Sequence, residues 1–185
     1  MDQSQSELGE AVARAQAGDP RGFEVLFREL GAPVAGYLRS RSVSDPDGIA
    51  NEVFLRAFRT IHTFDGDAQR FRSWLFTIAH HAAVDDARRR GRRVREAPID
   101  HAPEQAGGDV ETDVIANLAH ERVHALLSGL SADQREVLVL CVVADLSIAQ
   151  TAEVLGKRYE TVKTLRRRGL SALRAAISSN EGAPR

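Results

Sequence analysis

The sequence predicts an all-α protein made of two small helical domains joined by a flexible linker. Apolar residues recur at helical spacing through most of the 185 residues, and no stretch alternates with period two as a half-buried strand would. Prolines and glycines lie among acidic and small residues between positions 97 and 109, which is typical of an extended linker. We therefore expect domains at residues 5–95 and 112–178, with the linker at 96–111.

In the N-terminal domain, helices are predicted from apolar positions that recur every three or four residues. The first such stripe begins at Leu8, and the second begins at Phe23 and continues past Pro33 or is followed there by a further helix. Asp45 followed by Pro46 predicts the next helix start, because aspartate is a favoured N-cap and proline suits the first helical position.

The last helix of this domain is strongly apolar and ends in a cationic block. A loop at 64–67 precedes it, its apolar residues start at Phe71, and it runs into the arginine-rich stretch 88–95. The acidic residues that follow, up to Asp113, have no lysine or arginine among them. Charge is therefore segregated along the chain although the formal net charge is only −1, and such segregation is more informative than the total.

The C-terminal domain carries the signature of a helix-turn-helix. A helix is expected to resume near Glu111. Two serine–glutamine pairs then match the capping box: Ser131 with Gln134, and Ser147 with Gln150. In this motif the side chain of each residue accepts a hydrogen bond from the backbone N–H of the other. Gly156 is suited to a left-handed helix end, and a third helix is predicted from Tyr159. Short helices joined by a tight glycine turn are typical of DNA-binding motifs.

The third helix of this motif has a cationic outer face. Its central residues fall at i, i+1, i+4 and i+5: Lys163, Thr164, Arg167 and Arg168. They are surrounded by Lys157, Arg158, Arg166 and Arg174. Arginine and lysine in a major groove read guanine edges or neutralise phosphates, so this face predicts DNA binding. The alternative is a solvated charged face on an ordinary amphipathic helix.

Other features limit the class of protein. Cys141, the only cysteine, cannot form an internal disulfide and lies on an apolar helix face, which suits a reducing compartment. The N-terminus is polar and acidic, and no window reaches the apolar length of a membrane span. We expect a cytoplasmic protein without membrane insertion.

Four segments in order resemble the sigma-70 family of bacterial transcription initiation factors, most closely its small extracytoplasmic-function (ECF) group. Asp47–Phe58 is similar to the helix that binds core polymerase, and Phe71–Ala79 with the following arginines is similar to the segment that melts promoters and reads the minus-ten element. Leu130–Leu138 is similar to the opening of the C-terminal domain, and Thr161–Thr164 to the core of the minus-thirty-five recognition helix. The resemblance covers the chain from about Leu8 to Ile177, and only the linker within this range is unmatched.

The resemblance implies a sigma region 2-like bundle and a sigma region 4-like helix-turn-helix that bind core RNA polymerase and promoter DNA. It also implies regulation by an anti-sigma factor, and no catalysis or cofactor. Core polymerase would bind Asp47, Asn51 and Glu52. Minus-ten DNA, with one base flipped from its stack, would contact Phe64, Arg72, His80, His81, Arg88 and Arg89. Minus-thirty-five DNA would contact Arg158, Lys163, Thr164, Arg167 and Arg168.

Parts of the sequence are also compatible with other functions. His120, Glu121 and His124 match the H-E-x-x-H zinc motif, but no third ligand follows at a suitable spacing, and a catalytic zinc needs three protein ligands. His81 and Asp85 also stand at a metal-ligand spacing. A free-standing helix-turn-helix regulator would explain the C-terminal domain equally well, but not the polar face of Asp47, Asn51 and Glu52.

Overall fold

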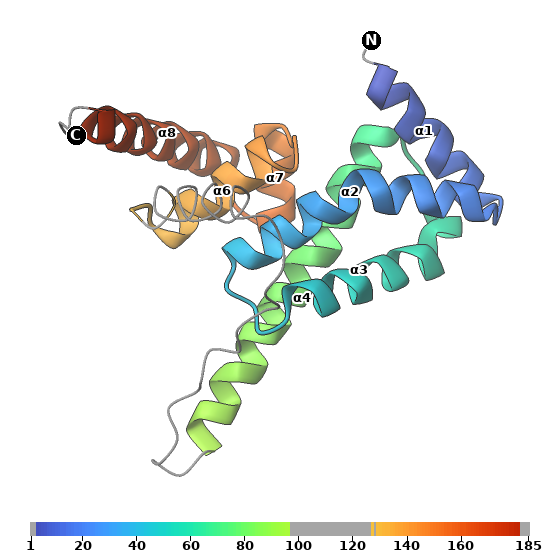
Figure 1. The fold of residues 1–185 in the computed structure, drawn as a ribbon, viewed down its shortest axis with the longest axis horizontal. Helices are drawn as coiled ribbons and strands as arrows, with labels where there is room; N and C mark the ends of the chain where they lie inside the picture. The colour runs from blue at the N-terminus through green and yellow to red at the C-terminus, as the bar shows by residue number, and fades with distance from the viewer. Residues whose placement is uncertain (1–2, 97–126, 128, 182–185) are drawn as a thin grey trace.

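The computed structural model describes residues 3–96, 127 and 129–181, and all regular secondary structure within these residues is helical. The predicted all-α class is therefore confirmed. Within the described residues, four α-helices and a short 3-10 helix lie between 3 and 96, and three α-helices lie between 129 and 181: α1 (Gln3–Gln16), α2 (Pro20–Ser40), α3 (Pro46–Thr60), η1 (Ile61–Thr63), α4 (Ala68–Glu96), α6 (Ala132–Val142), α7 (Ile148–Leu155) and α8 (Tyr159–Glu181) (Figure 1). The expected linker, the helix near Glu111 and the His120–His124 motif lie outside the described residues.

Helices α1–α4 form the N-terminal bundle. The helix starts that the sequence predicts are made by side-chain caps: Asp45 Oδ1 accepts from the backbone N–H of Gly48 at 2.9 Å, which confirms the start of α3. Helix α2 runs unbroken through Pro33, so the alternative of a separate helix after that proline is wrong. Several large side chains of the bundle are completely buried, among them Leu26, Val53, Phe71 and Phe76.

Helices α6–α8 form the C-terminal unit, and local hydrogen bonds define it. Both predicted capping boxes are present, with both reciprocal bonds at Ser131 and at Ser147. Gly156 ends α7 in the left-handed conformation (φ 61°, ψ 29°). At the crossing of α6 and α8, a Cβ added to Gly169 would lie 2.8 Å from Leu138 Cδ1, so this glycine permits the close approach of the two helices.

The C-terminal unit lies against the bundle. Helices α6 and α7 pack beside α2 and α4, whereas α8 projects away from them (Figure 1). Buried residues of the unit belong to the same apolar cluster as the bundle core: Val139, Leu140, Ala144, Leu146 and Val154. A small separate cluster inside the unit is built on Val137, Ala152 and Val162. The two predicted domains therefore share one core in this structure.

Candidate nucleic-acid interface

An aromatic pocket opens where the loop 64–67 meets α4. The Phe64 ring lies 5.4 Å from that of Phe71 and 5.3 Å from that of Trp74, measured between centroids. The pocket has a volume of about 610 Å³, and the residues that line it come from η1, the loop, α4 and α7: Thr63, Phe64, Asp65, Arg70, Ser73, Trp74, Thr77, Gln150 and Glu153. We call this the aromatic pocket. Aromatic walls of this kind can stack an unpaired base.

Hydrogen bonds hold the pocket loop in place. The Gln16 side chain of α1 donates to the backbone carbonyl of Phe64 at 2.6 Å, and Asp67 Oδ1 accepts from the Arg70 N–H at 2.8 Å at the start of α4. Of the residues predicted to contact minus-ten DNA, Phe64 lies in the pocket. Arg72 does not line it: this arginine is half-buried, and its Nε has no hydrogen-bond partner among the described residues. Arg70 and Trp74 take positions there that sequence reasoning did not assign.

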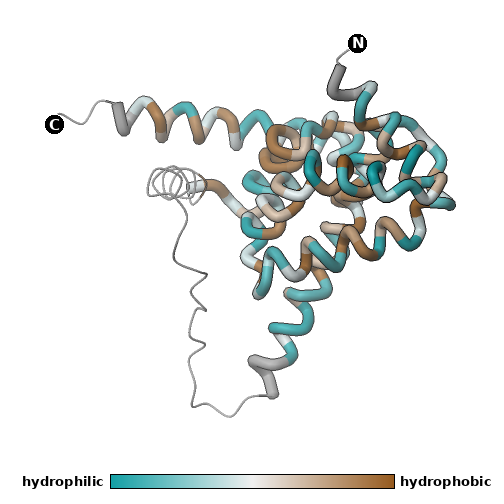
Figure 2. Tube along the Cα trace, turned by 45° about the vertical axis from the view of Figure 1, so that its right-hand side comes forward, coloured by the Kyte–Doolittle hydropathy of each residue, from teal (hydrophilic) through white to brown (hydrophobic). Residues whose placement is uncertain are grey.

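Beyond the pocket, α4 presents a second set of predicted residues. His81 is exposed, and so are Arg88 and Arg89. Figure 2 shows hydrophilic residues along the part of α4 that extends past the bundle. Asp86 on the same helix is buried instead, and it accepts from the Ser44 hydroxyl at 2.7 Å and from Arg90 Nε at 2.9 Å. Burial favours the neutral acid, but the bonds from Ser44 and the Arg90 charge outweigh it, so the pKa of Asp86 lies below its ordinary value.

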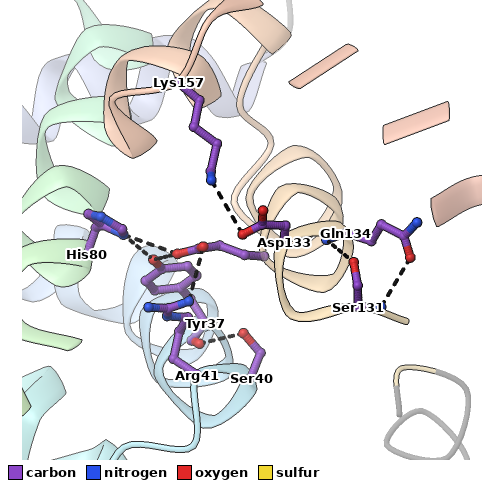
Figure 3. Close-up of polar contacts among 9 residues, drawn as sticks. Tyr37, Ser40, Arg41, His80, Ser131, Asp133, Gln134 and Lys157 are labelled. Carbon is purple, nitrogen blue, oxygen red and sulfur yellow. Dashed lines mark hydrogen bonds and ion pairs between the residues drawn. The ribbon is translucent and has the colours of Figure 1, made fainter. Parts of the chain in front are cut away.

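His80 belongs to a buried polar cluster between the bundle and the C-terminal unit, although the sequence suggested a DNA contact beside His81. Glu136 of α6 is 4% exposed. Its Oε1 accepts from the Tyr37 hydroxyl at 2.9 Å and lies 3.1 Å from His80 Nδ1, and its Oε2 lies 3.1 Å from Arg41 (Figure 3). We call these four residues the Glu136 cluster. Burial favours protonation of Glu136, but the His80 bond, the Arg41 charge and the Tyr37 bond prevail and lower its pKa. Burial, then the Glu136 charge, raises the pKa of Tyr37.

The outer face of α8 is open to solvent. Lys163, Arg167 and Arg168 are exposed and Thr164 is half-exposed, as the spacing predicts, and Arg158 is exposed in the preceding turn. Lys163 Nζ lies 3.7 Å from Glu160, an exposed pair that contributes little to stability and leaves the lysine available to a stronger anion. Inward, Val162 and Gly169 are buried, so the helix orientation matches the expected one.

A third surface lies on α3. The side chains of Asp47, Asn51 and Glu52 are exposed, while Ile49 and Val53 are buried beneath them. Asp47 also pairs with Arg39 at 2.8 Å. Sequence reasoning missed the apolar component of this surface: Leu55 is 55% exposed and lines a groove with Glu52 and Arg56, and Phe27 lines a second groove with Asp47 and Asn51. Leu55 follows directly after the two buried residues Val53 and Phe54 and therefore lies off the apolar stripe of α3. Its exposure could have been predicted from this position in the sequence.

Within the described ranges, no helix is long and apolar enough to cross a membrane. No group of three or more histidine, cysteine or acidic residues is placed to hold a metal ion there, so His81 and Asp85 are not part of such a group.

Comparison with known proteins covers both halves of the chain. Residues 26–93 match the family model "Sigma-70 region 2", and residues 120–173 match "Sigma-70, region 4". The chain is 32% identical over 178 residues to the ECF RNA polymerase sigma factor SigD of Mycobacterium tuberculosis, covering 92% of this chain and 84% of SigD. It is 29% identical to the ECF sigma factor BldN of Streptomyces coelicolor, covering 93% of this chain and 66% of BldN.

Among solved structures, the chain is similar to CnrH in a complex with the cytosolic domain of CnrY. The TM-score is 0.65 and the identity 26%, and the match covers 94% of this chain and 98% of CnrH.

Proposed function

This chain belongs to the ECF group of the sigma-70 family of RNA polymerase sigma factors, and on that premise we propose which of its surfaces perform each step of promoter recognition. As a transcription initiation factor, the protein binds core RNA polymerase and directs it to promoters, and it is not itself an enzyme. We assign these steps to individual residues of the domains at 5–95 and 112–178.

The outer face of α8 reads the minus-thirty-five element. Lys163, Thr164, Arg167 and Arg168 enter the major groove, with Arg158 on the adjacent backbone. Contacts to base edges give sequence preference, whereas contacts to phosphates give affinity that falls with salt. Arg167→Ala and Arg168→Ala should each cost about 1–3 kcal/mol in promoter binding if they contact bases. Arg21→Ala, at an exposed arginine of α2, is the control, and unchanged selectivity in both α8 variants would contradict the assignment.

The aromatic pocket captures an unpaired base of the minus-ten element. Stacking on Phe64 and Trp74 compensates for the few kcal/mol that base flipping costs. His81, Arg88 and Arg89 lie along α4 where they can follow the displaced strand. Arg70 on the rim of the pocket takes the role first expected of Arg72.

Core polymerase binds the α3 surface. The single observation that carries this proposal is the exposed face of Asp47, Asn51 and Glu52 flanked by the exposed apolar side chains of Leu55 and Phe27. DNA binding by a free-standing regulator does not require such a surface. Charged groups around an apolar patch are the usual composition of a protein interface.

Glu52→Lys tests the polymerase-binding surface. The substitution replaces attraction by repulsion toward a cationic partner and should weaken binding to core polymerase about tenfold or more, with slower association. Stability should change by no more than about 0.5 kcal/mol because the residue is exposed. Thermal unfolding and a polymerase titration measure the two quantities.

Glu7→Lys is a matched control for this experiment. Glu7 is an exposed glutamate of α1, and Figure 1 shows α1 and α3 on opposite sides of α2. The control should bind core polymerase like the wild type. Equal affinity of Glu52→Lys and wild type would favour the free-standing regulator.

We place the protein in the cytoplasm, where polymerase is found, and assign it a protein regulator of the anti-sigma type. The support for this partner is that CnrH, a similar structure, was solved with the cytosolic domain of CnrY bound.

A further inference from the structure

Helix α1 contacts both ends of the loop that carries Phe64. Gln16, the last residue of α1, uses both hydrogens of its side-chain amide: Nε2 donates to the Phe64 carbonyl at 2.6 Å and to the Ile61 carbonyl at 3.3 Å. At the other end of the loop, a Cβ added to Gly9 of α1 would lie 3.9 Å from Cβ of Ala68, the first residue of α4. Helix α1 therefore supports the loop from its entry to its exit.

The two carbonyls that accept from Gln16 lie where a helix ends. Helix η1 spans Ile61–Thr63, and Phe64 leaves it in the extended conformation (φ −72°, ψ 133°). The last carbonyls of a helix have no partner among the residues that continue it, so a side chain that donates to them fixes the direction in which the chain leaves. Gln16 thus acts as a cap for the end of η1, although it belongs to a different helix.

The direction of the backbone at Phe64 sets the position of its ring. The ring faces Phe71 and Trp74, with centroids 5.4 Å and 5.3 Å away. On its other side the loop passes close by, because a Cβ added to Gly66 would lie 2.9 Å from Phe64 Cζ. The ring has little room to move while the backbone stays in place. A shift of the backbone would therefore move one wall of the aromatic pocket.

Gln16 is itself held by a well-packed helix. Val12 and Ala15 of α1 are buried, and α2 approaches so closely that a Cβ added to Gly22 would lie 2.7 Å from the Ala11 carbonyl oxygen. Gln16 is exposed in spite of its two hydrogen bonds. Its replacement should therefore change the stability of the bundle little, and the effect should be confined to the loop.

We propose that Gln16 is a positioning residue for promoter melting: from α1, it holds the Phe64 loop in the conformation that captures the unpaired minus-ten base. This inference rests on the proposed role of the aromatic pocket in base capture. Gln16 acts through the Phe64 backbone and not by contact with DNA. Without its two bonds, the loop spends part of its time in other conformations, and the apparent Kd is the intrinsic Kd divided by the fraction that is competent to bind.

Gln16→Met is the variant that tests this role. Methionine is a good helix former of similar length, but its side chain donates no hydrogen bond and adds no charge near the DNA. Gln16→Ala is a second variant with the same loss of donors. Ala13→Met is the matched control, because Ala13 is an exposed residue of α1 almost one turn earlier. All three should melt within about 3 °C of the wild type.

The measurement is binding of a labelled single-stranded DNA to holoenzyme assembled from core polymerase and the full chain. The DNA carries the minus-ten strand of a promoter that the wild-type holoenzyme uses, either intact or with an abasic site at each position in turn. The position at which base removal weakens wild-type binding most identifies the captured base. Gln16→Met and Gln16→Ala should bind the intact strand about three- to tenfold more weakly, the effect of about one ordinary hydrogen bond.

The abasic strands separate a positioning role from a general structural one. If Gln16 acts through the pocket, the variants and the wild type should bind alike once the captured base is removed, because the two changes then affect the same interaction. Ala13→Met should follow the wild type on every strand.

Each outcome decides one of the two proposals. Equal binding of wild type and Gln16→Met to the intact strand overturns the positioning role and leaves base capture in place, provided that one abasic position weakens the wild type. A variant that is weakened equally on the intact and the abasic strand acts outside the pocket, which also overturns the role. A wild type that is insensitive to every abasic position removes base capture from the proposed function, and this inference with it.

Discussion

The N-terminal bundle and the C-terminal unit differ in what holds their helices together. The bundle buries large side chains such as Tyr37, Phe71 and Phe76 completely. The unit has capping boxes at two helix starts and a left-handed glycine, but its own apolar cluster is small, and much of its buried surface lies against the bundle. A short helical unit can thus be specified by local hydrogen bonds and still take most of its core from a neighbour. Undocked, such a unit would expose that apolar surface to solvent.

An added methyl group should lower the free energy of unfolding more in the bundle than in the C-terminal unit. A Cβ on Gly22 of α2 would meet the backbone of α1, with the Ala11 carbonyl oxygen 2.7 Å away, and backbone cannot move aside as a side chain can. Gly22→Ala should therefore cost about 3 kcal/mol of unfolding free energy, at the upper end for overpacked sites. Urea titration measures the loss.

Two glycines provide the comparison for this substitution. A Cβ on Gly31, also in α2, would meet only Phe27 at 3.8 Å, so Gly31→Ala should be neutral or stabilise by up to about 1 kcal/mol through helix propensity. A Cβ on Gly169 in the unit would press on the flexible end of Leu138, and Gly169→Ala should fall between the other two. A loss at Gly169 as large as that at Gly22 would contradict the contrast between the halves.

Removal of a helix cap tests whether local hydrogen bonds hold the helices of the C-terminal unit. Ser147→Ala removes the oxygen that accepts from the Gln150 N–H and should cost about 1 kcal/mol. Because α7 has so few residues, we expect faster amide exchange concentrated in that helix. Asp45→Ala removes the corresponding cap of α3, and there the larger core should keep the helix closed. Similar exchange increases in both helices would remove the distinction.

Acidification is the mildest test, with no effect at neutral pH. The pKa values of Asp86 and Glu136 are both lowered in the folded protein, so each contributes stability above its unfolded pKa, near 4, and that contribution is lost as pH falls through the folded value. The melting temperature should therefore decline below about pH 4, and Asp86→Asn or Glu136→Gln should each reduce the decline.

Local chemistry could be predicted from the sequence, and long-range packing could not. The caps at Asp45, Ser131 and Ser147 depend on residues three positions apart, and the exposed faces of α3 and α8 follow from helical periodicity. Glu136 could not be recognised in this way: in sequence it is one acid in the first turns of a helix, and its partner Tyr37 lies 99 positions away.

The same limit applies to α3 and α4. The first half of α4 is apolar on several sides, so periodicity does not tell which face meets a neighbour, and His80 and His81 look equivalent in the sequence. Leu55 is apolar, but the helix turns it to solvent. Both cases concern which surface a residue faces, and this depends on tertiary packing.

The shared core also sets an order of events during synthesis. The Gln69–Gln150 contact joins residues 81 positions apart, whereas α1 to α4 complete one another within the first 96 residues. At about 5–20 residues per second, the chain from 97 to 155 takes about 3–12 seconds to translate after α4. During that interval the nascent bundle displays the apolar face that α6 and α7 later cover, so this surface is open to aggregation until the second half of the chain emerges.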